Sequence, residues 1–260
     1  MLTIITVTFN DLDNLKKTLK SILSSPESNF ELIVIDGNSK DGTTDYLLSI
    51  NDRRLKSISE PDKGIYDAMN KGITMAKGNW VVFMNGGDQF LNTDTLSRVL
   101  DACNNESDFD VLYSDHVVAY QASKWLSETK DLKKINKGMV FCHQASIIKS
   151  SLLRDNPYDL QYKIASDYNL FISLYLKGAK FKKIDFPIAL VSAAGVSDTY
   201  RFKTMMDYRK VQKNHGILKA YGLDLITIGL WLQFKVEVRD KIFRKSIRMK
   251  KSYNSIFSSN

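Results

Sequence analysis

The first half of the chain alternates short apolar runs with segments whose apolar residues recur every three or four positions. Residues 2–8 and 31–36 are short and rich in β-branched side chains, which predicts buried strands. Residues 12–23 have helical spacing and predict a helix between them. This order predicts the α/β fold class, with a mostly parallel sheet and helices on both faces. The alternation continues with a predicted helix over 43–50, a strand over 55–59, a helix over 65–76 that stops at Gly78, and a strand over 80–84.

Beyond residue 110 the periodicity is weaker. Residues 111–113 and 117–120 predict a strand or a hairpin, 168–176 a helix, and 180–184 and 188–191 two late strands. In an open parallel sheet, ligands bind at the carboxyl ends of the strands. We therefore expect the functional residues in the polar loops that follow predicted strands, over 9–13, 37–42 and 85–89.

Composition places the chain among ordered globular proteins, and charge divides it in two. Its 260 residues are 43% hydrophobic and 25% charged, which excludes disorder, collagen and coiled coil. Residues 1–200 hold 23 basic and 25 acidic side chains, a net −2, whereas residues 201–260 hold 14 and 4, a net +10. Nucleic-acid enzymes normally carry positive charge over the cleft. We therefore expect no nucleic-acid partner.

The basic segment forms a second predicted unit, a helical tail over 201–260 after a catalytic domain over 1–200. Residues 217–238 are apolar but interrupted by charges, and their longest uncharged stretch, 225–234, has ten residues. A membrane span needs about 20. Because seven Lys and Arg follow between 239 and 251, the tail fits an amphipathic helix on an anionic membrane surface. The alternative is a helix that packs on the catalytic domain and exposes its charged end.

The remaining composition favours a cytoplasmic protein. Two cysteines, Cys103 and Cys142, are too few for a disulfide framework or a Cys-rich zinc module, which favours a reducing compartment. No basic stretch precedes an apolar one at the start of the chain, so we expect no secretory signal. His116 and His215 lack metal-ligand spacing and are expected to be structural.

Two acidic loops follow predicted strands. Asp36 precedes Gly37, a pattern in which the carboxylate accepts hydrogen bonds from a ribose or a base. Asp41, in the same loop, is better explained as a turn residue and helix cap. Asn85 and Asp88 flank two glycines, and their oxygen atoms suit Mg²⁺ or Mn²⁺, although this motif alone is an ordinary turn.

A third carboxylate opens the predicted helix over 168–176. Ser166 as N-cap and Asp167 in the first turn would both stabilise that helix, and this explanation is complete by itself. However, the chain also contains a nucleotide-type loop, with Asp36, and a metal-type loop, with Asn85 and Asp88. Beside two such loops, Asp167 could serve as the base for an incoming hydroxyl group.

Other residues have alternative interpretations. Asp115 follows the predicted strand over 111–113 and either contacts an acceptor or metal or is an ordinary exposed carboxylate. Trp125 has an apolar face that can stack on a sugar ring, Trp80 fits the core, and Trp231 fits a membrane interface. The loop over 195–197 either closes over a donor or is a plain loop.

In chain order, these loops make a specific set of motifs. The set resembles the family 2 glycosyltransferases of the GT-A fold, particularly bacterial members that build O-antigen or other surface polysaccharide on a lipid carrier. The resemblance covers residues 1–200 and rests on IITVTFN (4–10), VIDGNSKDGT (34–43), EPDKGIYDAMNKG (60–72), FMNGGD (83–88), FCHQAS (141–146) and IASDY (164–168).

The resemblance implies a role for each matching residue. Asp88 would bind Mn²⁺ or Mg²⁺, and Asp167 would be the catalytic base. His143 and Gln144 would lie near the sugar or the acceptor. The donor-binding residues would be Thr8, Asp36, Asp62, Asp67 and Asn70.

The metal loop departs from the family pattern. Asn85 and Gly87 stand where family members usually carry further aspartates, and residues 34–36 hold one of the usual two adjacent aspartates. Fewer charges weaken metal binding by the protein alone. We therefore expect the donor diphosphate to recruit the ion.

The resemblance also implies a reaction, the transfer of a hexose such as glucose or galactose from a UDP-sugar to a polyprenyl-diphosphate-linked sugar. One base opposite the leaving group implies inversion at the anomeric carbon, and the acceptor implies the inner face of a bacterial membrane. A metal-dependent nucleotidyltransferase remains an alternative, but it would need a Gly-rich basic loop where residues 9–13 are acidic. A non-enzymatic, basic-tailed module for membrane or nucleic acid is disfavoured by the net −2 of residues 1–200.

Overall fold

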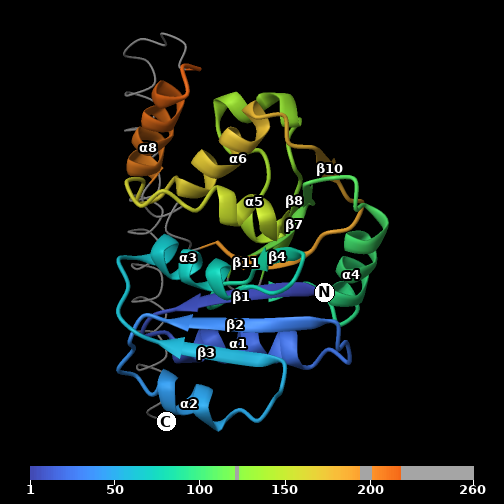
Figure 1. Cartoon of the computed structure of the whole chain (residues 1–260), viewed down its shortest axis with the longest axis vertical. Coiled ribbons are helices and arrows are strands. Elements are labelled where there is room, and N and C mark those ends of the chain that lie inside the picture. Colours follow the sequence, from blue (N-terminus) through green and yellow to red (C-terminus); the bar gives the residue numbers. More distant parts are fainter. Residues whose placement is uncertain (121–122, 194–200, 218–260) are drawn as a thin grey trace, which may run out of the picture. The chain divides into compact units, whose positions relative to one another are not determined.

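A computed structural model of the chain describes residues 1–120, 123–193 and 201–217 (Figure 1). Its contacts divide the chain into a first unit, Met1–Ala193, and the residues that follow. The α/β class predicted from the sequence is confirmed. The elements of the first unit are β1 (Leu2–Thr8), α1 (Leu12–Leu23), β2 (Phe30–Asp36), α2 (Thr43–Ser49), β3 (Leu55–Ser59), α3 (Ile65–Met75), β4 (Trp80–Phe83), β5 (Gln89–Phe90), α4 (Thr95–Asn105), β6 (Val111–Tyr113), β7 (His116–Tyr120), β8 (Ser123–Ser127), 3₁₀ helices at Leu132–Lys137 and His143–Ala145, β9 (Ser146–Lys149), α5 (Ser150–Asp155), α6 (Ser166–Leu176), β10 (Phe181–Lys183) and β11 (Ala189–Ser192).

Seven strands form the central sheet, in the order β10-β6-β9-β4-β1-β2-β3. Neighbours run parallel except at β9, which is antiparallel to β4 on one side and to β6 on the other. The register aligns Thr8 of β1 with Asp36 of β2, and Asp36 with Ser59 of β3. The carboxyl ends of these strands therefore share one edge of the sheet, and their loops meet there.

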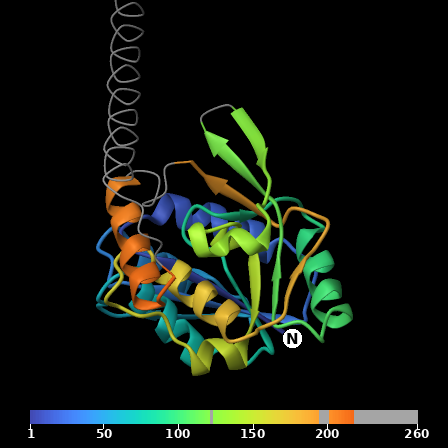
Figure 2. The same cartoon turned by 90° about the horizontal axis from the view of Figure 1, so that it is seen from above.

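Both faces of the central sheet are covered by helices (Figures 1 and 2). On one face, Ile4 of β1 belongs to an apolar cluster with Leu19 of α1 and Leu96 of α4. On the other face, α3 approaches β1 so closely that a Cβ on Gly72 would lie 2.6 Å from Cγ2 of Ile5. The alternation of apolar side chains along β1 thus supplies both layers of the core.

A second, four-stranded sheet has the order β5-β11-β7-β8. Its strand β5 begins directly after Asp88, so the metal-type loop connects the two sheets. Strand β8 lies at the edge and pairs with β7, and this hairpin projects from the rest of the first unit in Figure 2.

The structure corrects two expectations about elements. Residues 111–113 and 117–120 do not form a hairpin with each other, because β6 belongs to the central sheet and β7 to the second sheet. The hairpin partner of β7 is β8. Sequence periodicity also missed β9, a strand of four residues between two short helices, and the helix α4.

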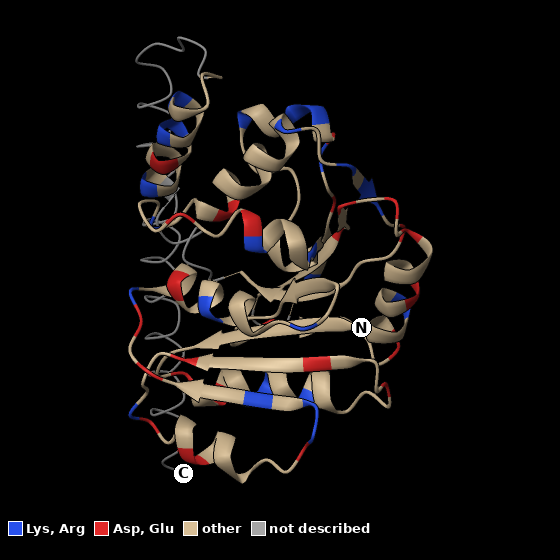
Figure 3. Ribbon diagram, in the orientation of Figure 1, with Lys and Arg blue, Asp and Glu red and all other residues tan. Residues whose placement is uncertain are grey.

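After Ala193, the described part of the second unit contains α8 (Arg201–Asn214), which carries basic side chains along its length (Figure 3). The apolar segment over 218–238, its basic continuation, Trp231 and the loop over 195–197 lie outside the described residues. No helix among the described residues is both long enough and apolar enough to cross a membrane. Membrane contact of the tail therefore stays a prediction.

Candidate functional site

The loops after β1 and β2 are tied together by hydrogen bonds at the carboxyl edge of the sheet, where acidic residues end β2 and follow β3 (Figure 3). The backbone of Asn10 is in the left-handed region, with φ 48°. The N–H of Asn10 donates to Ser39 Oγ at 2.7 Å, and its Oδ1 accepts from the N–H of Lys40 at 2.8 Å. Asp41 accepts from the N–H groups that open α1 and α2, at 2.9 and 3.2 Å. Asp41 therefore helps to cap the start of α2, as the sequence predicted, although the N-cap position itself is Gly42. Its bond to the start of α1 was not predicted.

Asp36 lies inside this edge of the sheet. Its side chain has no exposed area, and it accepts hydrogen bonds from the N–H of Ser39 at 3.1 Å, Thr44 Oγ1 at 3.3 Å and Ser59 Oγ at 2.5 Å. The hydroxyl of Ser39 is a further donor. These bonds make Asp36 the organiser of the loop over 37–43, and its direct contact with a nucleotide stays a prediction.

Phe9, Gly37 and Asp62 form the surface beside this loop. Phe9 is 63% exposed although it is aromatic. A Cβ on Gly37 would lie 2.7 Å from Asp62 Oδ2 and 3.1 Å from Phe9 Cδ2, so the three residues lie close together. An exposed ring beside a carboxylate can stack on a planar base while the carboxylate accepts its N–H group. The sequence analysis did not single out Phe9. The sequence feature that could have identified it is an aromatic residue directly after a buried strand.

The loop after β4 runs beside the end of β1. Gly86 donates to β1 at 3.0 Å, and Thr18 of α1 donates to the carbonyl of Asn85 at 3.1 Å. A Cβ on Gly86 would lie 3.5 Å from Thr8 Oγ1, so this loop and Thr8 are neighbours. Thr8 Oγ1 and Asn85 Oδ1 are buried and have no hydrogen-bond partner among the described residues. Buried polar atoms normally have partners, so this pair points to a ligand.

Asp88 closes the loop and is 7% exposed. Burial raises the pKa of its carboxyl group to about 7, against the opposing effect of a hydrogen bond from Gln144. Gln144 in turn accepts from the thiol of Cys142 at 3.0 Å. Gln144, predicted to lie near the acceptor, therefore holds the carboxylate of Asp88.

The oxygen atoms of this loop fit a divalent cation that is shared with a ligand. Asp88 supplies a carboxylate and Asn85 an unpartnered amide oxygen, both of the hard type that Mg²⁺ and Mn²⁺ prefer. Across residues 1–120, 123–193 and 201–217, no group of three or more His, Cys, Asp or Glu side chains is placed to hold an ion. Recruitment of the ion by the donor diphosphate stays a prediction.

Asp167 lies in the first turn of α6, as predicted. Its Oδ1 accepts hydrogen bonds from the N–H of Tyr168 at 2.7 Å and from the hydroxyl of Tyr66 at 3.2 Å. Both bonds lower the pKa of Asp167, but desolvation has the larger effect and raises this pKa to about 6. The predicted cap is wrong, because Ala165 is the N-cap and Ser166 is already helical. The buried Ser166 Oγ has no partner among the described residues.

Cys142 links Asp88 with Asp167. Burial raises the pKa of its thiol to about 12, and the negative charges of both carboxylates add to the increase. Both carboxylates therefore lie near enough to influence this one thiol. That they belong to a single catalytic site stays a prediction.

A buried aromatic group supports this site. The Nε2 of His143 lies 2.6 Å from the hydroxyl of Tyr158, and its ring stacks on Phe83 with centroids 4.9 Å apart. Burial lowers the pKa of His143 to about 4, so the ring is neutral at pH 7. The side-chain amide of Asn70 bonds both the carbonyl and the N–H of Tyr158, each at 2.8 Å. In this structure His143 and Asn70 position Tyr158, and their predicted substrate contacts stay predictions.

Three predicted site residues have contacts outside this group. Asp67 accepts the N–H of Lys63 at 2.9 Å at the start of α3. Asp115 forms an ion pair with Lys183 at 2.8 Å. Trp125 is 46% exposed on the edge strand β8. The predicted contacts of these three residues with the donor or the acceptor stay predictions.

Two cavities of the described residues are lined by other side chains. One of about 560 Å³ is lined by α4 and residues 182–186, and one of about 200 Å³ lies by Met1 and Trp80 at the other end of the strands.

Comparison with known sequences gives a family match. The profile described as "Glycosyl transferase family 2" matches residues 3–155. A PGL/p-HBAD biosynthesis glycosyltransferase of Mycobacterium bovis is 31% identical over 179 residues, which cover 67% of this chain and 70% of that protein. The UDP-Glc:alpha-D-GlcNAc-diphosphoundecaprenol beta-1,3-glucosyltransferase WfaP of Escherichia coli is 25% identical over 225 residues, 84% of this chain and 87% of that protein.

Solved structures share the fold at low sequence identity. S. aureus TarS 1-349 in complex with UDP-GlcNAc has a TM-score of 0.67 and 17% identity, and covers 90% of this chain and 71% of that chain. In a match to another structure of S. aureus TarS, this chain spans 43% of the length of that chain. Mannosyltransferase PcManGT from Pyrobaculum calidifontis, in complex with GDP-Man and Mn²⁺, has a TM-score of 0.65 and 13% identity, with 98% and 80% coverage. The predicted GT-A fold is confirmed.

Proposed function

Because this chain belongs to glycosyltransferase family 2 and is a nucleotide-sugar-dependent glycosyltransferase, we propose that it is an inverting hexosyltransferase acting on a lipid-linked sugar. The donor would be a UDP-sugar, UDP-glucose or UDP-galactose. The observation that carries this proposal is a pair of carboxylates, buried Asp88 and half-buried Asp167, whose pKa values are both raised and which both act on the thiol of Cys142. Carboxylates with perturbed pKa values are typical of catalytic sites.

The donor nucleoside would lie over the carboxyl ends of β1 and β2. Phe9 presents an exposed ring for the base, and Asp62 lies beside it. Thr8 offers an unpartnered hydroxyl near the loop that bears Asp88. The UDP-GlcNAc complex of a structural neighbour supports a uridine donor.

Asp88 and Asn85 would hold Mn²⁺ or Mg²⁺ together with the donor diphosphate. When bound, the ion would neutralise the charge that develops on the departing nucleoside diphosphate. The neighbour in complex with GDP-Man and Mn²⁺ supports a divalent ion. The protein's own contribution is a carboxylate held by Gln144, as its hydrogen bond to Asp88 indicates.

Asp167 would act as the base for the acceptor. The acceptor oxygen attacks the anomeric carbon, its proton passes to Asp167, and the anomeric bond to the diphosphate breaks. With a pKa of about 6, Asp167 is mostly ionised at pH 7 and still basic enough to take the proton. A single displacement inverts the anomeric configuration, so an α-linked donor would give a β-glycoside.

The acceptor would be a sugar on polyprenyl diphosphate, in the synthesis of O-antigen or another surface polysaccharide. The name of the relative WfaP includes a diphosphoundecaprenol acceptor, which supports this class. His143, Asp115 and Trp125 remain candidate acceptor contacts. The net charge of +10 over residues 201–260 would hold the enzyme at the inner, anionic face of the membrane.

A donor panel tests this proposal. The full chain is incubated with UDP-, GDP- and TDP-sugars and Mn²⁺, with and without a lipid-linked N-acetylhexosamine acceptor. We expect acceptor-dependent release of UDP from UDP-glucose or UDP-galactose. Release of pyrophosphate instead would indicate a nucleotidyltransferase, and binding of vesicles or nucleic acid without turnover would indicate a non-enzymatic module.

A further inference from the structure

Tyr66 belongs to the motif over 60–72, yet donor binding does not account for its position. It lies in the first turn of α3, and its hydroxyl reaches two groups at the start of α6. Its single hydroxyl proton is shared between two acceptors, the carbonyl of Ile164 at 2.7 Å and Oδ1 of Asp167 at 3.2 Å. Its ring stacks on Tyr158 with centroids 5.3 Å apart. Burial and the charge of Asp167 raise the pKa of Tyr66 well above its usual value, so the hydroxyl keeps its proton and remains a donor.

The carboxylate of Asp167 is held through one of its two oxygens. Oδ1 accepts the backbone N–H of Tyr168 and faces the hydroxyl of Tyr66, whereas Oδ2 lies outside both of these contacts. The two donors come from different directions, since one belongs to α6 itself and the other to α3. Together they restrict the rotation of the carboxyl group, which leaves Oδ2 for a proton from a substrate.

We propose that Tyr66 is a positioning residue for the base: its hydroxyl fixes Oδ1 of Asp167 so that Oδ2 faces the acceptor hydroxyl. This inference rests on the proposed role of Asp167 as the base. It also gives the motif over 60–72 a function on the acceptor side, because α3 would connect the donor loop at Asp62 with the base on α6.

The groups that face Asp167 make this hydrogen bond influential. Tyr66 faces it from α3, Tyr158 lies near it in the segment between α5 and α6, and Cys142 lies near it in the segment before the 3₁₀ helix at His143. Burial raises the pKa of both Tyr158 and Cys142, so these groups are neutral at pH 7 and offer no charge to stabilise the carboxylate. His143, whose pKa burial lowers, is neutral as well. Loss of the Tyr66 hydroxyl should therefore raise the pKa of Asp167 further.

Tyr66→Phe removes the hydroxyl and keeps the ring that stacks on Tyr158. We expect kcat at pH 7 to fall about 10- to 100-fold, the effect of losing one hydrogen bond to a charged group, with KM for the donor changed by less than about twofold. The acid limb of the pH–rate profile should move to higher pH. Tyr113→Phe is the matched control, because Tyr113 is buried and stacks on Phe141 in the same unit. We expect the control to change neither kcat nor the pH profile.

Two further measurements separate this inference from a fold defect and from the proposed function. In an Asp167→Asn background, Tyr66→Phe should reduce the residual rate by less than about twofold, because the group it positions is gone. Carboxyl ¹³C NMR titration, with Asp167→Asn to assign the signal, measures the pKa of Asp167 without any substrate. A pKa that stays the same in Tyr66→Phe, or a full loss of rate in the Asn background, would overturn the positioning role. A wild-type protein without transfer activity would refute the proposed function, while the titration would still decide whether Tyr66 controls Asp167.

Discussion

The carboxyl group of Asp88 is held in a protein environment that favours its protonated form. Burial raises its pKa to about 7, whereas an aspartate in an unfolded chain titrates near 3.9. Because the folded pKa is the higher one, its contribution to stability is fully present below the unfolded pKa and is lost as the pH rises through the folded pKa. At pH 8 the native state therefore carries an unfavourable charge at the position that the proposed function uses for a cation.

Asp88→Asn should consequently stabilise the protein in a pH-dependent way. We expect the free energy of unfolding to exceed that of the wild type by roughly 2–4 kcal/mol at pH 8 and to differ little near pH 4. Denaturant unfolding in EDTA measures this difference, with the exposed Asp13→Asn as the control for the substitution itself. A variant that is no more stable than the wild type at pH 8 would contradict the environment described for Asp88. Transfer activity should fall in the same variant, which is a trade of function against stability.

Among single residues, the sequence motifs identified the carboxylates better than the side chains that surround those carboxylates. The cap at Asp41 and the first-turn place of Asp167 follow from local sequence, and both are found in the structure. Phe9 and Tyr66 were missed because their importance comes from tertiary contacts: Phe9 with a glycine in the loop after β2, and Tyr66 with a helix distant in sequence. The predicted cap at Ser166 was wrong by one position, since local preference does not fix the exact start of a helix.

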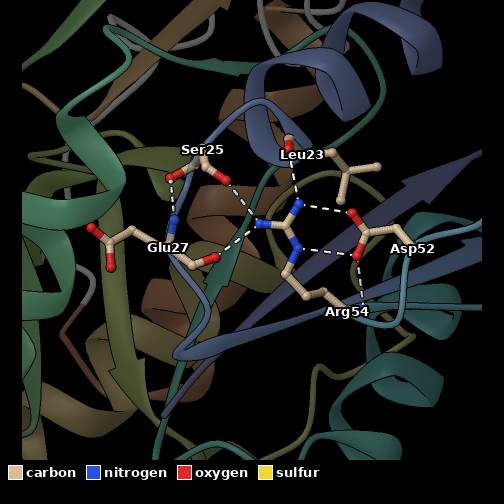
Figure 4. Close-up of polar contacts among 5 residues, drawn as sticks. All are labelled: Leu23, Ser25, Glu27, Asp52 and Arg54. Carbon is tan, nitrogen blue, oxygen red and sulfur yellow. Dashed lines mark hydrogen bonds and ion pairs between the residues drawn. The ribbon is translucent and has the colours of Figure 1, made fainter.

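Between single residues and the fold, Arg54 illustrates how one side chain joins several elements (Figure 4). Its guanidinium donates to the carbonyls of Leu23, Ser25 and Glu27 at 2.8–2.9 Å, where α1 ends and the chain turns toward β2. It also forms a two-pronged ion pair with Asp52, at 3.0 and 2.7 Å. The hydrogen bond from Arg54 keeps the pKa of Asp52 below its usual value despite burial. Helix end, loop and β3 are therefore connected by one guanidinium group.

Arg54→Lys should destabilise the fold and spare the site. A lysine keeps the charge but lacks the planar set of donors that reaches three carbonyls and both carboxylate oxygens. We expect a loss of about 2–4 kcal/mol in the free energy of unfolding, with UDP affinity unchanged at a temperature where the variant is folded. The exposed Arg53→Lys serves as control. Equal denaturation midpoints for the two variants would show that the guanidinium network adds no stability.

Sequence periodicity was most successful for elements whose burial is local and regular. The limits of β1, α1 and β3 agree with the predicted ranges 2–8, 12–23 and 55–59. It failed for β9, because a strand of four residues leaves no period to detect and is specified by pairing with β4 and β6. It also suggested a hairpin of residues 111–113 and 117–120, since sequence order cannot reveal that the chain changes sheets between β6 and β7.

For the whole molecule, the uneven charge gives a test of membrane contact. Removing the residues after 238 deletes seven Lys and Arg that would face anionic lipid. Each basic residue near an anionic surface contributes about 1 kcal/mol, so vesicle sedimentation should show at least a tenfold weaker binding to phosphatidylglycerol vesicles. Hydrolysis of the UDP-sugar without acceptor should change by less than about twofold. Equal loss of both properties would show that the tail has a structural role.

The proposed reaction requires that Asp167 is the base of a site that binds UDP independently of this side chain. Calorimetry with UDP and Mn²⁺, and turnover with the donor and acceptor found in the panel, should therefore be measured on the wild type and on Asp167→Asn. We expect Asp167→Asn to bind UDP with an affinity within about twofold of the wild type and to turn over about 10²- to 10⁴-fold more slowly. A variant that keeps its turnover, or loses UDP binding and turnover together, would contradict the proposed role of Asp167.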